Sequence, residues 1–93
     1  MTAAEKTATA VGATIGAGAS TTTTGVVEGI YTATIATTLD WIVFADFSEI
    51  KWVKAYTTAT GVEGTAYVDS TTKNKVFTTT TGATTYLVKG IKA

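Results

Sequence analysis

Residues 39–56 read LDWIVFADFSEIKWVKAY, and this stretch contains both tryptophans and two of the three phenylalanines of the 93-residue chain. The remainder is mostly threonine, alanine and glycine, with 24 threonines in all. A folded core depends on buried bulky apolar side chains, and most of those available lie in this one segment. Residues 39–56 therefore decide which fold the chain can adopt.

Two apolar runs, residues 41–47 and 50–57, are separated by Phe47-Ser48-Glu49 and are rich in β-branched and aromatic residues. These residue types favour strands. A single helix over residues 39–56 is the alternative, because four apolar residues recur at helix-like spacing: Leu39, Val43, Phe47 and Ile50. If the second run is a strand, alternation places large rings beside a lysine stem on one face: Ile50, Trp52, Lys54 and Tyr56.

Further strands are expected at residues 26–37, 62–68, 75–81 and 84–91, where branched, aromatic and threonine side chains are frequent. Turn-forming residues separate them at Thr60-Gly61, at residues 69–74 and at Thr81-Gly82-Ala83. Alternation predicts which side chains share a face: Val62, Gly64, Ala66 and Val68 in one strand, and Tyr86, Val88 and Gly90 in the last.

Short strands about 8–12 residues apart, with turns between them, are typical of a sandwich or a barrel. The sequence therefore predicts an all-β fold, a small antiparallel β-sandwich or barrel of immunoglobulin-like size formed by residues 25–93. The chain contains no proline, so exposed strand edges lack one common barrier to further pairing, although single lysines can serve the same purpose.

Residues 1–24 differ in composition, since they consist mainly of alanine, glycine and threonine. Glycines at positions 12, 16 and 18 each disfavour a helix interior by about 1 kcal/mol. We expect an extended N-terminal arm, and our hypothesis is that it lies on a neighbouring subunit. The alternative is an N-terminal helix or edge strand that packs on its own domain.

The composition argues against an enzyme and against a nucleic-acid-binding protein. There is no cysteine and no histidine, so thiolate chemistry, the commonest zinc ligands and the usual general base are missing. Seven lysines balance seven acidic residues, and no arginine is present to read bases or phosphates with two hydrogen bonds. We expect no catalytic residue, no cofactor and no nucleic-acid partner.

The sequence also bears on location. The N-terminus lacks the positive start and the apolar run of a secretory signal, so we do not expect export. The longest apolar run, residues 41–45, is far shorter than the roughly 20 residues of a membrane-spanning helix. A soluble protein or a subunit of an assembly is therefore expected, with no membrane partner.

Two groups of side chains are candidate binding sites. Asp40, Asp46 and Glu49 offer oxygen ligands for calcium, but their spacing matches no calcium loop, and carboxylates at strand ends are usually solvated. Trp41, Trp52 and Tyr56 offer an aromatic platform for a sugar. In a chain with so few large side chains we expect these rings to pack in the core instead. We therefore predict neither a metal site nor a ligand site.

Glycines and lysines give no stronger signal. The pairs Gly12/Gly16 and Gly61/Gly64 lack the frame of a phosphate-binding loop, so turn and close-packing roles explain them better. Lys73 and Lys75 flank Asn74 at an expected hairpin tip. They are expected to keep the tip soluble, and a contact to an acidic partner surface is the alternative.

Four segments carry a resemblance to a known class: LDWIVFADFSEI (39–50), AYTTATG (55–61), AYVDS (66–70) with Asn74 leading into Val76, and LVKG (87–90). Their succession resembles small β-sandwich proteins of tailed-phage and related virus particles. In those proteins an apolar strand pair is followed by a "TG" hairpin, a polar turn and a last strand that ends in a small residue. The resemblance spans residues 30–91 and transfers no functional residue.

The resemblance implies a structural virion protein that decorates or cements the capsid surface. Such proteins often form trimers whose N-terminal arms reach a neighbour, so the implied partners are copies of the chain and a major capsid protein or equivalent scaffold. Threonine fits this role, because it stiffens strands and keeps a sheet face wetted with little charge. Two alternatives remain: an extracellular filament or pilus subunit that assembles by strand addition, and a carbohydrate-binding β-sandwich module.

Overall fold

The structure is a computed structural model that describes residues 2–12 and 26–93. Seven strands are present in these ranges: β1 (Thr9–Ala10), β2 (Val26–Ile35), β3 (Asp40–Val43), β4 (Phe47–Thr57), β5 (Ala66–Val68), β6 (Lys75–Thr78) and β7 (Gly82–Lys92). The described residues form no helix that could cross a membrane. The all-β prediction is confirmed, and residues 39–56 form strands rather than the alternative helix.

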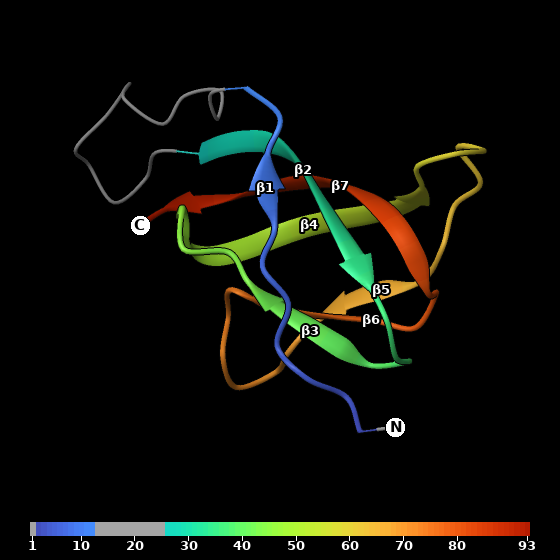
Figure 1. The fold of residues 1–93 in the computed structure, drawn as a ribbon. Helices are drawn as coiled ribbons and strands as arrows, with labels where there is room; N and C mark the ends of the chain where they lie inside the picture. Colours follow the sequence, from blue (N-terminus) through green and yellow to red (C-terminus); the bar gives the residue numbers. More distant parts are fainter. Residues whose placement is uncertain (1, 13–25) are drawn as a thin grey trace.

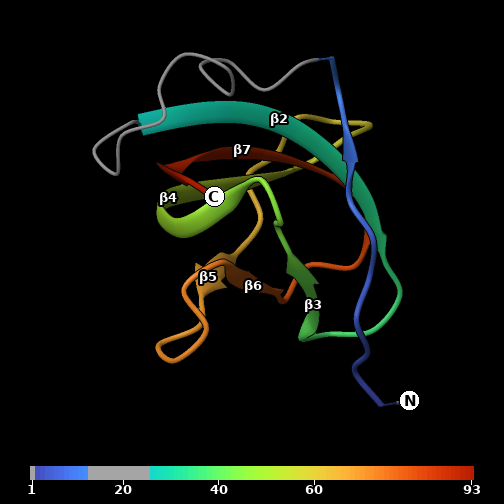
Figure 2. The same ribbon diagram turned by 90° about the vertical axis from the view of Figure 1, so that its left-hand side faces the viewer.

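The strands form two antiparallel sheets that face each other, as Figures 1 and 2 show. The larger sheet has the strand order β1-β2-β7-β4, and the smaller sheet has the order β3-β6-β5. The chain leaves β3 of the small sheet and enters β4 of the large sheet within residues 43–47. The two apolar runs of the deciding stretch therefore lie in different sheets, which confirms the antiparallel β-sandwich.

The core lies between the two sheets, and both contribute to it. Residues 39–56 supply Ile42, Phe44, Phe47, Ile50 and Ala55, and the other strands supply Val27, Tyr31, Ile35, Val76, Tyr86 and Val88. The rings of Tyr31, Phe44 and Tyr86 meet edge to face, with centroids 5.0 and 5.8 Å apart in the two neighbouring pairs. The two buried hydroxyls of Thr78 and Tyr86 bond to each other at 2.6 Å, so neither is left without a partner.

The prediction that Ile50 shares a face of β4 with Trp52, Lys54 and Tyr56 is wrong for Ile50. Ile50 points into the core, whereas Trp52, Lys54 and Tyr56 are on the opposite face of the sheet. The pairing of β4 with β7 has two irregularities, between Phe47 and Glu49 and between Ile50 and Trp52, and the second one separates the direction of Ile50 from that of Trp52. Each irregularity adds one residue to β4, and an extra residue reverses the direction of every side chain that follows.

The strand expected at residues 62–68 is also shorter than predicted. Only Ala66–Val68 forms β5 in the small sheet, while Glu63 makes an isolated bridge to Tyr56 at the edge of the large sheet. Gly64 donates its backbone N–H to the carbonyl of Ala55. This segment therefore crosses from one sheet to the other and covers one side of the sandwich.

The N-terminal segment crosses between the sheets on the opposite side (Figure 1). Glu5 bridges Trp41 of β3, and farther along β1 pairs with β2 in the large sheet. Residues 2–12 thus pack on their own sandwich, as the edge-strand alternative predicted. The rest of the expected arm, residues 13–24, and the expected domain boundary before residue 25 lie outside the described residues.

Deleting residues 1–8 is therefore expected to destabilise the isolated domain. The deletion removes two backbone hydrogen bonds, from Lys6 N to the Trp41 carbonyl at 2.7 Å and from Trp41 N to the Ala4 carbonyl at 3.1 Å. At about 1 kcal/mol for each bond, the free energy of unfolding should fall by at least about 2 kcal/mol in urea denaturation.

The matched control is Glu5→Ala, because Glu5 is exposed and its substitution leaves both backbone bonds in place. Its unfolding free energy should match that of the wild type. If the deletion altered assembly while the unfolding free energy of the monomer stayed constant, residues 1–8 would belong on a neighbouring subunit instead.

Candidate functional site

The three acidic candidates for calcium binding are used in three different ways. Asp40 is 1% exposed, whereas Asp46 accepts a hydrogen bond of 2.8 Å from the Tyr31 hydroxyl. Glu49 forms an exposed ion pair of 3.0 Å with Lys51. Within residues 2–12 and 26–93, no three acidic side chains gather where they could hold a metal ion.

Asp40 differs most from expectation, because it is buried rather than solvated. Its Oδ1 accepts the backbone N–H of Ala4 at 2.8 Å, and its Oδ2 accepts those of Ala36 and Thr37 at 2.9 Å. The ammonium of Lys6 lies 3.9 Å from Oδ2. One carboxylate therefore ties the N-terminal segment to the β2–β3 turn, in which Leu39 adopts a φ of 72°.

Two opposing effects act on the pKa of Asp40. Burial raises it, because a charged carboxylate loses its hydration, while the three backbone N–H donors and then Lys6 lower it. The lowering effects win, and the pKa lies below the ordinary value of 3.8. Asp40 is therefore an ionised structural anchor at neutral pH, and both of its carboxylate oxygens accept hydrogen bonds from the backbone.

The aromatic candidates do not form the platform considered from the sequence. Trp41 lies on the outer face of the small sheet, whereas Trp52 and Tyr56 lie on the outer face of the large sheet. The expectation that these rings fill the core is wrong as well, since Trp52 is 41% exposed and Trp41 and Tyr56 are half-buried. The core uses phenylalanine and tyrosine instead.

A different aromatic row crosses the small sheet. Phe77 of β6 pairs in register with Trp41 of β3 on one side and with Tyr67 of β5 on the other. Its ring centroid lies 6.4 Å from that of Trp41 and 5.4 Å from that of Tyr67. Such cross-strand pairs stabilise a sheet, here one of only three short strands. The sequence did not predict this aromatic row, because the row depends on which strands are neighbours in the small sheet.

Lys75 completes this row. Its ammonium lies 4.7 Å from the ring centroid of Trp41 and 5.0 Å from that of Phe77. Lys75 therefore covers aromatic rings, rather than serving only to solvate a hairpin tip. Asn74 is also structural, because its side-chain amide donates to the Phe47 carbonyl at 3.1 Å.

The outer side of the large sheet carries the main exposed apolar surface. We call it the large-sheet face. Four of its side chains are strongly exposed, by 54% for Val11, 65% for Val26, 45% for Ile30 and 41% for Trp52. The half-buried side chains of Tyr56, Leu87 and Ile91 lie between and beside them. Apolar patches of this kind on a soluble protein mark interaction surfaces.

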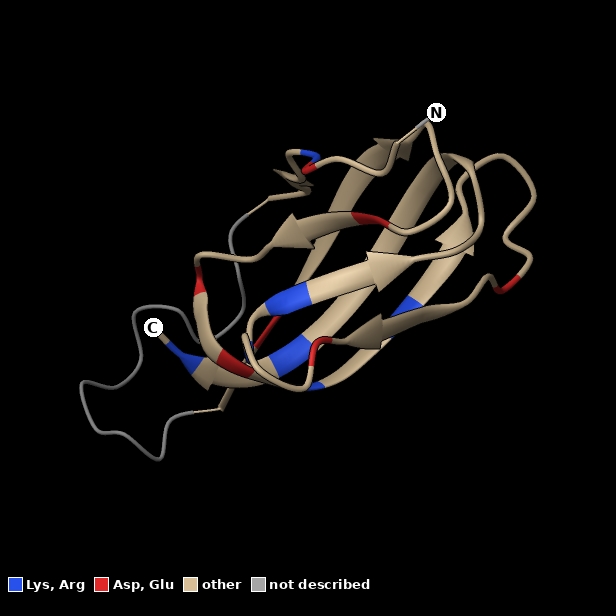
Figure 3. Cartoon of the chain, turned by 90° about the horizontal axis from the view of Figure 1, so that it is seen from below, with Lys and Arg blue, Asp and Glu red and all other residues tan. Residues whose placement is uncertain are grey.

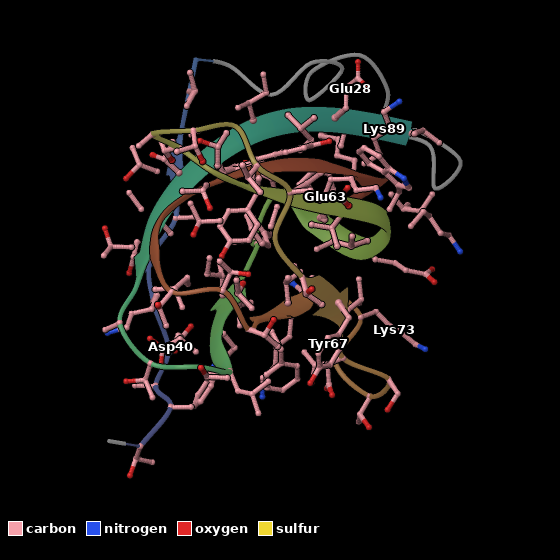
Figure 4. The ribbon with its side chains drawn as sticks, turned by 90° about the vertical axis from the view of Figure 1, so that its right-hand side faces the viewer. Glu28, Asp40, Glu63, Tyr67, Lys73 and Lys89 are labelled. Atoms are coloured by element: carbon pink, nitrogen blue, oxygen red, sulfur yellow. The ribbon has the colours of Figure 1, made fainter. Side chains whose placement is uncertain are left out.

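The large-sheet face also has a groove and paired charges. The groove has a volume of about 320 Å³ and is lined by Val11, Ile30, Trp52 and Leu87 among others. Lys89 lies 3.4 Å from Glu28 and 5.6 Å from the ring centroid of Trp52. Figure 4 shows Glu28 and Lys89 next to each other on β2 and β7.

Charges elsewhere are dispersed. Figure 3 shows lysines and acidic residues spread singly over the strands and loops, without a large region of one sign. Lys54 pairs with Glu63 at 2.8 Å, so this exposed charge is also balanced locally. A surface of this type does not repel a second copy of the chain.

The sequence held a signal for the large-sheet face. The outward positions of β2 and β7 include Val26, Ile30, Leu87 and Ile91, although their inward positions already supply the core. Strands that are apolar on both faces are typical of sheets covered on both sides. The second face of this sheet has no cover among residues 2–12 and 26–93.

Comparisons with known proteins do not place the chain in a family. No protein-family model matches the sequence, and the chain matches no curated protein and no solved structure.

Proposed function

We propose that the chain is a structural subunit of a protein assembly, of the kind that decorates or cements a virus capsid, and that it associates with copies of itself. The observation that carries this proposal is the large-sheet face, where four large apolar side chains are each more than two-fifths exposed on one sheet. Association would remove them from water, at roughly 25 cal/mol for each square ångström buried.

The other features of the molecule agree with a role based on contact. The side chains of the described residues form no cluster of metal ligands, and the buried anion Asp40 serves the fold. Balanced charges lower the repulsion between neighbouring copies. Major capsid protein or an equivalent scaffold is the further partner that we propose for such a subunit.

The two alternatives have weaker support. A carbohydrate-binding module requires accessible ring faces that lie in one plane. In the aromatic row, the Trp41 ring is tilted by 59° and the Tyr67 ring by 32° relative to the Phe77 ring between them. Lys75 also covers the rings of Trp41 and Phe77. A filament built by strand addition requires a segment that is free to leave its own domain. Residues 4–11 instead pair with both sheets of their own sandwich.

Sedimentation velocity on the full chain, from micromolar to millimolar concentration, tests the proposal. We expect the wild type to self-associate and Ile30→Lys to weaken this association at least about tenfold, because it places an unpaired charge in the apolar contact. The matched control is Val62→Lys, since Val62 is 64% exposed but lies in a loop outside the large-sheet face.

The control variant should associate like the wild type, and circular dichroism should show that both variants keep their strands. A wild type that stays monomeric up to millimolar concentration would overturn self-association. Equal effects of Ile30→Lys and Val62→Lys would mean that the large-sheet face is not the surface used.

A further inference from the structure

Outward side chains on β2 and β7 are matched in chemical kind. These two strands pair in one continuous antiparallel register from Val26 with Ile91 to Ile35 with Gly82. On the large-sheet face, four of the five directly opposed pairs are matched: Val26 with Ile91, Glu28 with Lys89, Ile30 with Leu87 and Thr32 with Thr85. The fifth pair, Thr34 with Ala83, lies at the end of the register. Apolar residues face apolar residues, an anion faces a cation, and a hydroxyl faces a hydroxyl.

This matching has a consequence for a second copy. We infer that two copies pack through their large-sheet faces about a two-fold axis that runs parallel to the strands, between β2 and β7. The inference rests on the proposed self-association and names its geometry. Rotation about that axis places β2 of one copy over β7 of the other. Each residue therefore meets, in the second copy, the same residue that it pairs with in its own sheet.

The contact is self-complementary along its length. Ile30 of one copy meets Leu87 of the second copy, and Val26 meets Ile91. Glu28 of one copy meets Lys89 of the second, so two ion pairs within the chains become a cluster of four alternating charges. Both side chains are available for this contact, because Lys89 is 54% and Glu28 is 44% exposed.

A neighbouring axis is less favourable. If the axis ran between β7 and β4, each β7 residue would meet, in the second copy, the β4 residue with which it pairs in its own sheet. Leu87 would then face Lys54, and Ile91 would face Glu49. Both contacts bury a charge against an apolar side chain, which costs free energy. The axis between β2 and β7 avoids these mismatches.

The margins and the size of the contact fit a dimer of moderate strength. Val11 lies beside β2 and Trp52 lies on β4, so they are on opposite sides of the axis. Each of them widens the apolar contact beyond the two central strands. Three long strands cover roughly 500 Å² for each copy, from about 4.8 Å between strands and about 3.3 Å per residue. Two such faces reach roughly the 1,000 Å² at which specific interfaces begin.

Reciprocal charge reversal tests this geometry. Glu28→Lys places lysines opposite Lys89 of the second copy, and Lys89→Glu places glutamates opposite Glu28. We expect each variant alone to dimerise at least about tenfold more weakly than the wild type. An equimolar mixture should form a heterodimer, because every lysine of one variant then meets a glutamate of the other. Sedimentation velocity with one variant fluorescently labelled measures this directly.

Glu63→Lys is the matched control, since Glu63 is 52% exposed and also pairs with a lysine, but lies outside the β2–β7 rows. Its dimerisation should equal that of the wild type, and melting curves should show that all variants fold. Rescue in the mixture supports the two-fold axis.

Three results would overturn the inference. If the wild type associates but the mixture of variants shows no rescue, the axis is wrong while the proposed self-association stands. If the wild type itself stays monomeric at millimolar concentration, both the self-association and the two-fold contact are wrong. A wild-type trimer, as the capsid-protein resemblance implies, would also contradict a contact that closes as a dimer.

Discussion

Replacing Asp40 with asparagine is expected to lower the midpoint of thermal unfolding by on the order of 10 °C. The substitution keeps the shape of the side chain but removes its charge and turns an N–H₂ group toward backbone donors. Three N–H groups, from Ala4, Ala36 and Thr37, now share the two carboxylate oxygens. At least one of these part-buried donors would lose its acceptor, and the buried side chain would lose the charge that attracts all three, which makes this one of the costlier single changes.

The same residue predicts how stability depends on pH. The pKa of Asp40 is lower in the folded state than its ordinary value of 3.8, so the folded state holds the ionised form more tightly than the unfolded chain does. Its stabilisation is therefore complete above about pH 4 and is lost as the pH falls through the lower, folded-state pKa. The difference in stability between wild type and Asp40→Asn should shrink over that acid range.

Asp69→Asn is the control for this experiment. Asp69 accepts the backbone N–H of Thr72 at 2.8 Å, and its pKa is also lowered, mainly by that bond, but it lies in the loop before β6. Its substitution should cost clearly less than Asp40→Asn in differential scanning calorimetry. Equal melting temperatures for the two variants would show that the buried site anchors nothing.

Gly90→Ala is the second substitution for which we expect a large effect. Gly90 of β7 is buried opposite Ile50, between the two irregularities of β4. A methyl group at this position would overlap the backbone carbonyl oxygen of Glu49 and come within 2.9 Å of the Ile50 Cα. Backbone atoms of a paired strand cannot move independently, so the free energy of unfolding should fall by about 3 kcal/mol or more.

Gly64→Ala separates this overlap from a general effect of adding a methyl group. The added carbon would lie 2.6 Å from the Thr80 hydroxyl oxygen and 2.9 Å from the Thr80 Cβ. Thr80 lies in the loop between β6 and β7, so it can shift as a whole more easily than the backbone of a paired strand. We expect a cost of about 1 kcal/mol in urea denaturation. If Gly90→Ala cost no more than Gly64→Ala, the close approach of β4 and β7 would not determine the shape of the large sheet.

Both residues bear on the proposed function. Asp40 holds the crossing N-terminal segment, which carries Val11 to the margin of the large-sheet face. Gly90 lies next to Lys89 and allows the bulged β4 to pair with β7 so that Trp52 points outward. A surface that recognises a second copy has to keep its side chains in fixed positions. Asp40 and Gly90 stabilise the backbone that carries these side chains.

The fold was largely predictable from local patterns. Strands at residues 26–37, 41–47, 50–57, 75–81 and 84–91 all correspond to observed strands, with ends that differ by a few residues. The sequence also predicted that Tyr86, Val88 and Gly90 share one face of the last strand, and the structure shows that all three are buried. Branched and aromatic residues, turn formers and a period of two are local properties, so the sequence displays them directly.

The positions of single side chains were less predictable. The expected face of β4 was wrong for Ile50, since nothing local marks the extra residues of a bulge. The expected burial of Trp41 and Trp52 was wrong too, because smaller rings already fill the space between the sheets. Asp40 was expected to be solvated, yet donors from three separate positions surround it.

By itself, the sequence determined the class of fold, the approximate strands and the residues able to form a core, because these follow from residue types and their period. Only the tertiary structure decided which strands are neighbours. That choice places Phe77 between Trp41 and Tyr67, sets Glu28 opposite Lys89 and brings Ala4 to Asp40. Contacts between residues far apart in the chain depend on strand order and register, and no local period encodes those.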